Sequence, residues 1–485
     1  MNNSNLVTKA IRGVLWSFAA RYGGKVMLLV STIILARLLS QEDFGVAGYA
    51  LIVIGLLDVL RGLGVGPALI YHQSNPRAAD TAFFISLVVG FLLFGITWML
   101  APLVGDFFND PRAVAVTQVL ALAFPLTALS NVHDALLQKE LAFKRRFIPD
   151  VLNAFAKGTV AIVLAVMGYG AWSLVFGQLA GTMVSVVAYW CVCSWRPSWR
   201  FDAALARSLL EFGAHIVAVN SLGYLLTHAG HVVVGRFLGA ASLGIYTLAF
   251  RLPDLLIRQI AVILSRVLFP AYTKLKDDPD SIKSGFLISM RYVALVTIPL
   301  GLGMSVVAEP LVVVLFTEKW IEAAPVLQAL SIHMMLVSLA FNIGDIYKAL
   351  GRPELLTRLA LFRAALLLPL LWWAATGPGT LAAVAWVSVV ATAVHMTVTV
   401  IMGARIVGVP VGKVIESFIP ALAAGGLMTC CVFVLSEATA AYGAWLELLA
   451  SVIVGIAVYL FVLLILSRET LLLAGQHLRT ALRRT

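Results

Sequence analysis

Several positively charged residues lie inside long apolar stretches of this sequence. Arg21 and Lys25 are four residues apart and Arg251 and Arg258 are seven apart, so helical periodicity would put each pair on one face. A charge at the centre of a membrane helix costs about 2.5–3.5 kcal/mol and normally faces a wet cavity or a counter-charge. The stretch with Arg21 and Lys25 has no acidic residue, and Asp254 can offset only part of the second pair. The pattern predicts a cavity that binds an anion.

Other charged residues in the apolar stretches have simpler explanations. Arg61 and Arg291 are also candidate cavity cations, although Arg61 can pair with Asp58 three residues earlier. Lys157, Arg266 and Arg363 can pair locally or extend toward the membrane surface. Four acidic residues could carry a coupling proton or sodium ion, and for each an ion pair with a nearby cation is the competing explanation. They are Asp58, Glu211, Asp254 and Asp345.

The residue types that build metal sites and catalytic centres are not grouped for that chemistry. His228 and His231 are close in sequence but lack a third ligand nearby. The four cysteines lie in apolar stretches without the spacing of a zinc site or a disulfide framework. We therefore expect no catalytic residue, no bound metal and no cofactor apart from a coupling proton or Na⁺, and we expect that the protein is not an enzyme.

The elements that must position these cations are membrane helices. The 485 residues are 61% hydrophobic and 12% charged, with a mean hydropathy of +0.96, which no soluble protein of this length matches. In lipid, backbone N–H and C=O groups can hydrogen-bond only to one another. Apolar segments long enough to cross the bilayer should therefore be α-helices. The sequence predicts an all-α polytopic membrane protein with about fourteen such segments. They are residues 14–36, 45–69, 81–104, 114–134, 147–167, 171–194, 209–235, 243–269, 286–308, 323–347, 359–376, 380–403, 414–436 and 445–467.

The basic residues predict how the chain is oriented. With fourteen segments, 22 Lys and Arg residues fall on the face that holds both termini and only 4 fall on the opposite face. This asymmetry predicts cytoplasmic termini. It also explains the net charge of +11 through contacts with anionic membrane lipids, so that no nucleic-acid partner is needed.

Two similar turns indicate an internal duplication. LARLLSQEDFGVAGYA at residues 35–50 returns as VGRFLGAASLGIYTLAF at residues 234–250, offset by 199 residues, with Gly45 matching Gly244. APLVGDFF and EPLVVVLF match similarly, as do NVHD and NIGD. Two six-helix lobes of equal orientation and two extra helices are therefore expected, with the glycines allowing tight hairpins. The expected domains are an N-terminal lobe at 1–195, a C-terminal lobe at 196–405, and two helices with a basic tail at 406–485.

The same turns, with LLQKELAFKRRF, FPAYTKLKDDPD and KALGRPELL, resemble the bacterial polysaccharide flippases, and most of all the colanic-acid exporter type. This family belongs to the superfamily of multidrug, oligosaccharidyl-lipid and polysaccharide exporters. The resemblance implies two lobes around a central cavity and ion-driven translocation of undecaprenyl-pyrophosphate-linked oligosaccharides across the bacterial inner membrane. Relatives place cavity arginines near the pyrophosphate, and the matching residues here are Arg21, Lys25, Arg251 and Arg258. A polysaccharide polymerase and other assembly proteins are the implied protein partners.

Two other functions compete with the flippase hypothesis. An ion-coupled multidrug antiporter of the same fold would be expected to place acidic groups in the cavity, and the first apolar segment has none. A membrane-embedded polysaccharide polymerase or glycosyltransferase would need a substantial outer loop, and the longest predicted outer connection is only about a dozen residues.

Overall fold

The computed structural model describes residues 23–61, 77–140, 142–198 and 201–466. Within these ranges the regular elements are all helical, which confirms the predicted all-α class. Twelve helical stretches of the described chain are long and apolar enough to cross a membrane. One of them, Asn220–Leu275, covers the eighth predicted segment and residues 220–235 of the seventh, and the first predicted segment is described only from residue 23. The count of fourteen segments therefore stays a prediction.

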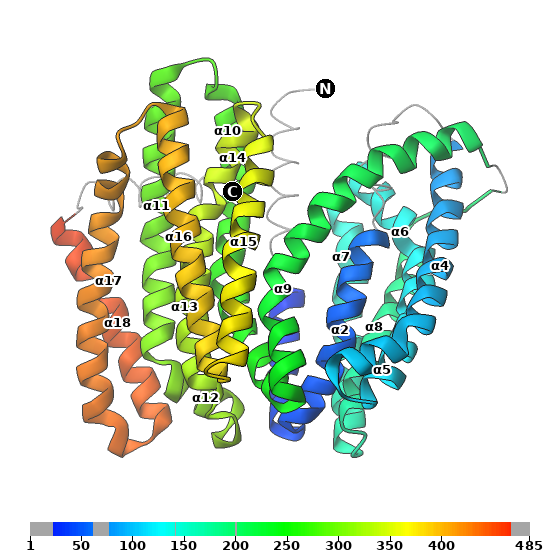
Figure 1. The fold of residues 1–485 in the computed structure, drawn as a ribbon, viewed down its shortest axis with the longest axis horizontal. Coiled ribbons are helices and arrows are strands. Elements are labelled where there is room, and N and C mark those ends of the chain that lie inside the picture. The colour runs from blue at the N-terminus through cyan, green and yellow to red at the C-terminus, as the bar shows by residue number, and fades with distance from the viewer. Residues whose placement is uncertain (1–22, 62–76, 141, 199–200, 467–485) are drawn as a thin grey trace. The chain divides into compact units, whose positions relative to one another are not determined.

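The chain divides into two compact units between Gly244 and Ile245. The predicted boundaries at residues 195 and 405 stay predictions. In the N-terminal unit, α7 and α8 pack along most of their length, and α4 packs on α5 and α6 (Figure 1). The helices are residues 23–38, α2 (Gln41–Arg61), α4 (Arg77–Phe108), α5 (Arg112–Ala121), α6 (Ala123–Lys139), α7 (Phe143–Val166), α8 (Ala171–Val192) and most of α9 (Ala203–Pro253).

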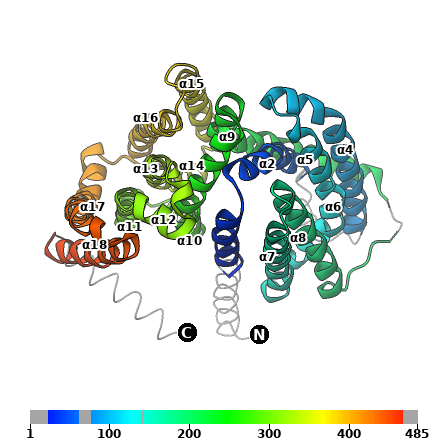
Figure 2. The same ribbon diagram turned by 90° about the horizontal axis from the view of Figure 1, so that it is seen from below.

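Glycines explain why α7 and α8 approach so closely. Gly177 and Gly181 are four residues apart on α8, so they lie on one face of that helix. A Cβ atom on Gly177 would lie 2.7 Å from the Cβ of Ala161, and one on Gly181 would lie 2.9 Å from the carbonyl oxygen of Asn153. In lipid, helices associate through such close packing rather than through burial from water. The two helices are neighbours in both views (Figures 1 and 2).

In the C-terminal unit, a buried apolar core holds α10, α11, α13, α14, α16 and α17 together. Phe286, Met290 and Ile298 of α11 contribute to it, as do Ile343 and Tyr347 of α14. The elements after α9 are a π-helical turn (Asp254–Arg258), α10 (Gln259–Leu275), α11 (Pro279–Val306), α12 (Ala308–Phe316), a 3₁₀ turn (Glu318–Trp320), α13 (Ala323–Phe341), α14 (Ile343–Ala349), α15 (Glu354–Thr376), α16 (Leu381–Val407), α17 (Val411–Thr439), a 3₁₀ turn (Ala440–Tyr442) and α18 (Ala444–Leu466).

The last two helices lie together at the edge of this unit (Figure 2). One side of α18 packs on α17 and α12, with Tyr459 buried and its hydroxyl donating to the carbonyl oxygen of Leu295 at 2.7 Å. The other side exposes apolar residues such as Ile453, Phe461 and Ile465. A helix that is apolar all round and exposed on one side suits contact with lipid.

Asp43, an acidic residue in the first copy of the repeated turn, has a structural role at the start of α2. The backbone N–H and the hydroxyl of Ser40 donate to the Asp43 carboxylate at 2.9 and 2.6 Å, and the Asp43 N–H donates to the Ser40 hydroxyl at 3.1 Å. This reciprocal arrangement is a capping box, which satisfies the free N–H groups at the start of α2. The second copy lacks both residues and continues within α9, where Gly239 breaks the helical geometry with a φ of 84°.

Candidate functional site

The structure describes some of the predicted cavity residues and not others. Arg21 and the side chain of Glu211 lie outside the described residues. Lys25 lies on the helix at residues 23–38, where its side chain is half-buried. Arg291 is exposed on α11. Their roles in substrate binding or ion coupling stay predictions.

Arg61 forms the local ion pair that was the competing explanation for its charge. Its Nε lies 2.7 Å from Oδ1 of Asp58, three residues earlier on α2. Its Nη1 donates to Oδ1 of Asn131 on α6 at 2.6 Å, a contact between residues 70 positions apart. The Arg61 side chain is only 15% exposed, whereas that of Asp58 is 51% exposed. The exposed carboxylate keeps this pair accessible, while Asn131 fixes the direction of the guanidinium.

Arg251 near the end of α9 and Arg258 in the turn that follows it both interact with the carboxylate of Asp254. Arg258 forms an ion pair with Asp254, and Asp254 also acts electrostatically on the half-buried Arg251. A π-helical turn runs from Asp254 to Arg258, directly after Pro253. Because a π-helix has more residues per turn than an α-helix, a spacing of seven no longer aligns Arg251 with Arg258 as α-helical periodicity predicts. The stretch keeps a net positive charge.

Asp345, the remaining described acidic candidate, is also engaged in an ion pair. Asp345 on α14 is buried, and its Oδ1 lies 3.3 Å from Nζ of Lys348. Its counterpart in the repeat, Asp134, lies 2.5 Å from Nε of Arg146 and accepts a hydrogen bond of 2.9 Å from the Tyr189 hydroxyl. The sequence marked Asp134 and Asp345 as equivalent, but their partners lie on different elements in the two copies.

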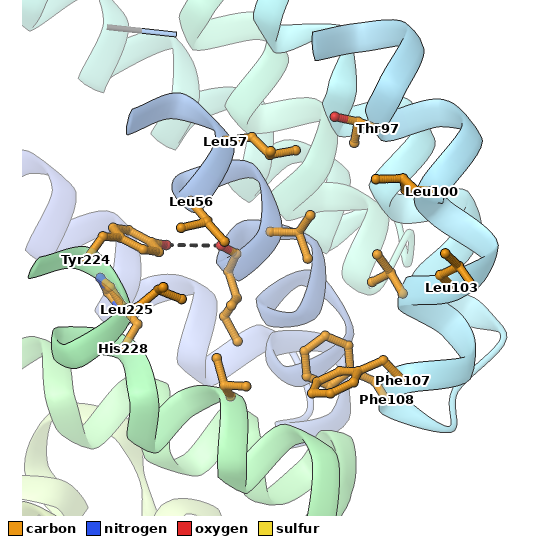
Figure 3. A pocket seen from close by; sticks show the side chains of 14 residues that line it. Leu56, Leu57, Thr97, Leu100, Leu103, Phe107, Phe108, Tyr224, Leu225 and His228 are labelled. Atoms are coloured by element: carbon orange, nitrogen blue, oxygen red, sulfur yellow. Dashed lines mark hydrogen bonds between the residues drawn. The ribbon is translucent and has the colours of Figure 1, made fainter. Parts of the chain in front are cut away.

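An apolar cavity of about 380 Å³ lies within the N-terminal unit, between α2, α4 and α9 (Figure 3). Tyr224 and His228 supply polar groups at its α9 side, with ring centroids 4.3 Å apart. The Tyr224 hydroxyl donates to the carbonyl oxygen of Ile52 at 3.2 Å. It lies so close to α2 that a Cβ atom on Gly55 would be 2.1 Å from it. The cavity is lined by Ile52, Val53, Leu56, Leu57, Thr97, Leu100, Leu103, Val104, Phe107, Phe108, Tyr224, Leu225, His228 and Val232.

This lining can accommodate a hydrocarbon chain rather than a charged group. Most of the side chains are aliphatic or aromatic, and the hydroxyl of Thr97 donates to the carbonyl oxygen of Leu93 at 2.6 Å. The volume is within the range of small-molecule sites in proteins. Sequence reasoning missed the cavity, because apolar residues that line a space look the same as those that face lipid.

The chain is similar in sequence to proteins of polysaccharide biosynthesis. Residues 34–325, more than half of the chain, match the family model described as polysaccharide biosynthesis protein. The lipopolysaccharide biosynthesis protein WzxC of Escherichia coli is 29% identical, with 75% of each chain covered. The teichuronic acid biosynthesis protein TuaB of Bacillus subtilis is 28% identical over 84% of this chain and 85% of the relative. The succinoglycan biosynthesis transport protein ExoT of Rhizobium meliloti is 24% identical over 75% of this chain and 73% of the relative.

Solved structures identify the same architecture. The lipid II flippase MurJ, in an inward closed conformation, superposes with a TM-score of 0.77 at 15% identity, with 94% of this chain and 100% of that chain covered. An inward-facing multidrug transporter of the MATE family gives a TM-score of 0.66 at 18% identity, with 79% and 94% covered. The predicted superfamily fold is therefore confirmed. The chain is a multi-pass membrane protein that belongs to the polysaccharide biosynthesis protein family, and its relative ExoT is named as a transport protein.

Proposed function

We propose that the protein moves undecaprenyl-pyrophosphate-linked oligosaccharide units across the bacterial inner membrane for exopolysaccharide or lipopolysaccharide biosynthesis. The family match over residues 34–325 is the observation that carries this proposal. The relative ExoT is named as a transport protein, which supports transport as the activity. The fold is similar to that of MurJ, which is named as a lipid II flippase, and this supports a lipid-linked substrate. A polysaccharide polymerase and other assembly proteins would act on the product.

Each part of such a substrate has a chemical counterpart in the chain. A pyrophosphate requires cations, and Arg21, Lys25, Arg251 and Arg258 are the cations predicted for it. An arginine can bind two phosphate oxygens at once through its planar guanidinium. The apolar cavity between α2, α4 and α9 has room for part of a prenyl chain.

Alternating access is the transport mechanism that we propose. The substrate would enter from the cytoplasmic side, on which the distribution of Lys and Arg predicts both termini, and leave toward the outer leaflet. A proton or sodium gradient would supply the energy. Among the described acidic candidates, Asp58, Asp254 and Asp345 each have a cationic partner, so a coupling proton at one of them would compete with an ion pair.

The MATE-like fold keeps multidrug antiport as a second candidate function. The family match and the relatives favour the glycan substrate over a cationic drug. The polymerase or glycosyltransferase alternative has less support, because ExoT is named as a transport protein and MurJ as a flippase.

The test is to delete the gene and analyse the lipid-linked sugars of the inner membrane. We expect completed repeat units to accumulate with their glycan facing the cytoplasm, where they resist a membrane-impermeant sugar label in spheroplasts. Re-expression of the full chain should make them accessible to the label. Sensitivity to cationic drugs without accumulation of repeat units would contradict the proposal and favour antiport.

A further inference from the structure

Three oxygen-bearing side chains lie on one face of the helical stretch formed by α13 and α14. They are Ser338, Asn342 and Asp345, and this stretch, Ala323–Ala349, is long and apolar enough to cross a membrane. Asn342 separates the two helices but keeps right-handed helical torsion angles, with a φ of −72° and a ψ of −18°. Residues three or four positions apart on a helix have Cβ atoms about 5–6 Å from each other. The three side chains therefore form a short column inside the C-terminal unit.

Each of these side chains has a buried oxygen atom that no donor reaches in the described part of the chain. Ser338 and Asn342 are fully buried, and Asp345 is 2% exposed. The atoms are Oγ of Ser338, Oδ1 of Asn342 and Oδ2 of Asp345. The Asn342 amide nitrogen donates to the carbonyl oxygen of Ser338 at 3.5 Å, so Oδ1 is the unused end of this amide. Unpaired buried polar atoms are rare, and a bound ion is one physical reason for them.

The first copy of the repeat shows what the equivalent asparagine binds. Asn131 is the counterpart of Asn342 at an offset of 211 residues, and its Oδ1 accepts a hydrogen bond of 2.6 Å from the guanidinium of Arg61. At the offset of 199 that relates the repeated turns, Arg61 corresponds to Ile260. An isoleucine side chain has neither a charge nor a donor. The second copy thus keeps the acceptor and replaces the cation that binds it in the first.

The break between the two helices adds a potential that favours a cation. Helix α13 ends at Phe341, so its last carbonyl groups carry the partial negative charge of a helix C-terminus. Asp345, three residues after Asn342, adds a full negative charge. In transporters, the C-terminal ends of interrupted helices contribute to the binding of small cations. A carboxylate, an amide oxygen, a hydroxyl and a helix end therefore act in the same direction here.

We propose that Ser338, Asn342 and Asp345 form a binding site for one sodium ion. All three side chains offer oxygen atoms, which are the ligands that hard cations take. One carboxylate balances a single positive charge, whereas calcium takes six to eight oxygen ligands and magnesium demands near-ideal octahedral geometry. Use of this ion to drive transport rests on the proposed function, but the binding of the ion does not.

Lys348 competes with the ion for the carboxylate of Asp345. Its Nζ lies 3.3 Å from Oδ1 of Asp345, and its side chain is 48% exposed, whereas that of Asp345 is 3% exposed. A half-exposed lysine can move its ammonium group into water while its stem stays on the apolar surface. Sodium binding should therefore displace Lys348, and removal of the lysine charge should tighten sodium binding.

The experiment compares sodium chloride with N-methyl-D-glucamine chloride at equal ionic strength, using the full chain purified into lipid nanodiscs. A ligand that binds only the folded state raises its unfolding temperature. We expect Tm to be several degrees higher in sodium chloride, with a saturable dependence on the sodium concentration. Asp345→Asn should abolish the difference, because it removes the charge at nearly the same shape. Asp280→Asn, which removes the charge of a fully exposed carboxylate, is the matched control and should retain it.

The other variants test the remaining groups of the site. Asn342→Ala and Ser338→Ala should each raise the sodium concentration that gives half of the Tm shift. Lys348→Gln should lower that concentration several-fold, because the competing charge is gone. It also decides the question should Asp345→Asn fail to fold, since its exposed side chain can be replaced without disturbing the core.

Equal Tm values for the wild type in both salts would overturn the proposal, as would a full sodium effect in Asp345→Asn or an unchanged sodium requirement in Lys348→Gln. The proposed function is judged separately, by the lipid-linked repeat units of the deletion strain. Sodium binding in a protein whose deletion leaves those units unchanged would support the site and contradict the transport function. Accumulated units without sodium binding would do the reverse.

Discussion

Gly45 and Gly244 hold equivalent positions in the two copies of the repeated turn, and each faces a backbone carbonyl of the other copy. A Cβ atom on Gly45 would lie 1.8 Å from the carbonyl oxygen of Ala240, and one on Gly244 would lie 2.0 Å from that of Gln41. Gln41 and Ala240 are separated by the same 199 residues as the two glycines. The contact is therefore reciprocal, as expected if both turns descend from one duplicated hairpin.

Gly45→Ala should destabilise the protein severely. Real Cβ atoms never approach a carbonyl oxygen to 1.8 Å, so α2 or the backbone at Ala240 must move. Overpacking usually costs about 1–3 kcal/mol, and backbone on both sides leaves little room to relax. We expect a clearly lower Tm and less protein in the membrane, measured on purified protein and by immunoblot. Gly95→Ala in α4 is the control, because no atom lies within 4 Å of its added Cβ. A wild-type Tm for Gly45→Ala would refute the close contact.

Arg21→Ala and Arg251→Ala should leave the protein in the membrane but stop glycan export, because each removes a cation proposed to bind the pyrophosphate. Export is measured by complementation of a flippase-deficient strain. Arg352→Ala, at an exposed site between α14 and α15, should complement fully. Lysine at position 21 or 251 keeps the positive charge but cannot bind two phosphate oxygens at once as arginine does. Export by the lysine variants therefore shows whether the charge alone is enough. Full complementation by both alanine variants would exclude the phosphate role.

Leu56→Trp should lower export by filling the apolar cavity between α2, α4 and α9. The larger side chain would occupy space that we assign to part of the prenyl chain. Leu92→Trp on α4 is the control, because Leu92 is 57% exposed and does not line the cavity. We expect both variants to reach the membrane in similar amounts and only Leu56→Trp to accumulate lipid-linked repeat units. Equal export by the two variants would remove the cavity from the proposed transport path.

Asp110 should make stability depend on pH in the acid range. It lies between α4 and α5, outside the membrane segments, and its Oδ2 lies 2.9 Å from Nη2 of Arg112. Burial alone would raise the pKa of Asp110, but hydrogen bonds from the Arg112 side chain and backbone outweigh it, so the pKa is lowered. A group whose pKa is lower in the folded state stabilises the protein above its unfolded pKa near 4, and this contribution is lost as the pH falls through the folded value.

The measurement is Tm between pH 7 and pH 3 for the wild type and Asp110→Asn. We expect the variant to unfold a few degrees lower at pH 7 and the gap to close toward pH 3. Asp280→Asn, which changes a fully exposed carboxylate at the start of α11, is the control. A gap that stays constant with pH would show that Asp110 acts through packing rather than through its charge.

Much of the fold could be predicted from the sequence because the bilayer restricts the choices. Apolar segments of sufficient length must be helices, and twelve helical stretches occupy the predicted places in the described chain. The repeated turns predicted a duplication, and the reciprocal contact of Gly45 and Gly244 agrees with it. The predicted role of these glycines in tight turns was wrong, because both lie inside helices and allow the two copies to approach each other closely. The i, i+3 pairing of Asp58 with Arg61 also followed from spacing on one helix.

The tertiary structure alone decided which side chains meet between helices. Local spacing does not encode how helices pack. It therefore could not predict that Asn131 is a partner of Arg61, that a π-helical turn ends at Arg258, or that no described carboxylate pairs with Arg363. The apolar cavity was hidden for a related reason. In a membrane protein the surfaces facing lipid, core and cavity are all apolar, so composition cannot distinguish them and only the packed helices can.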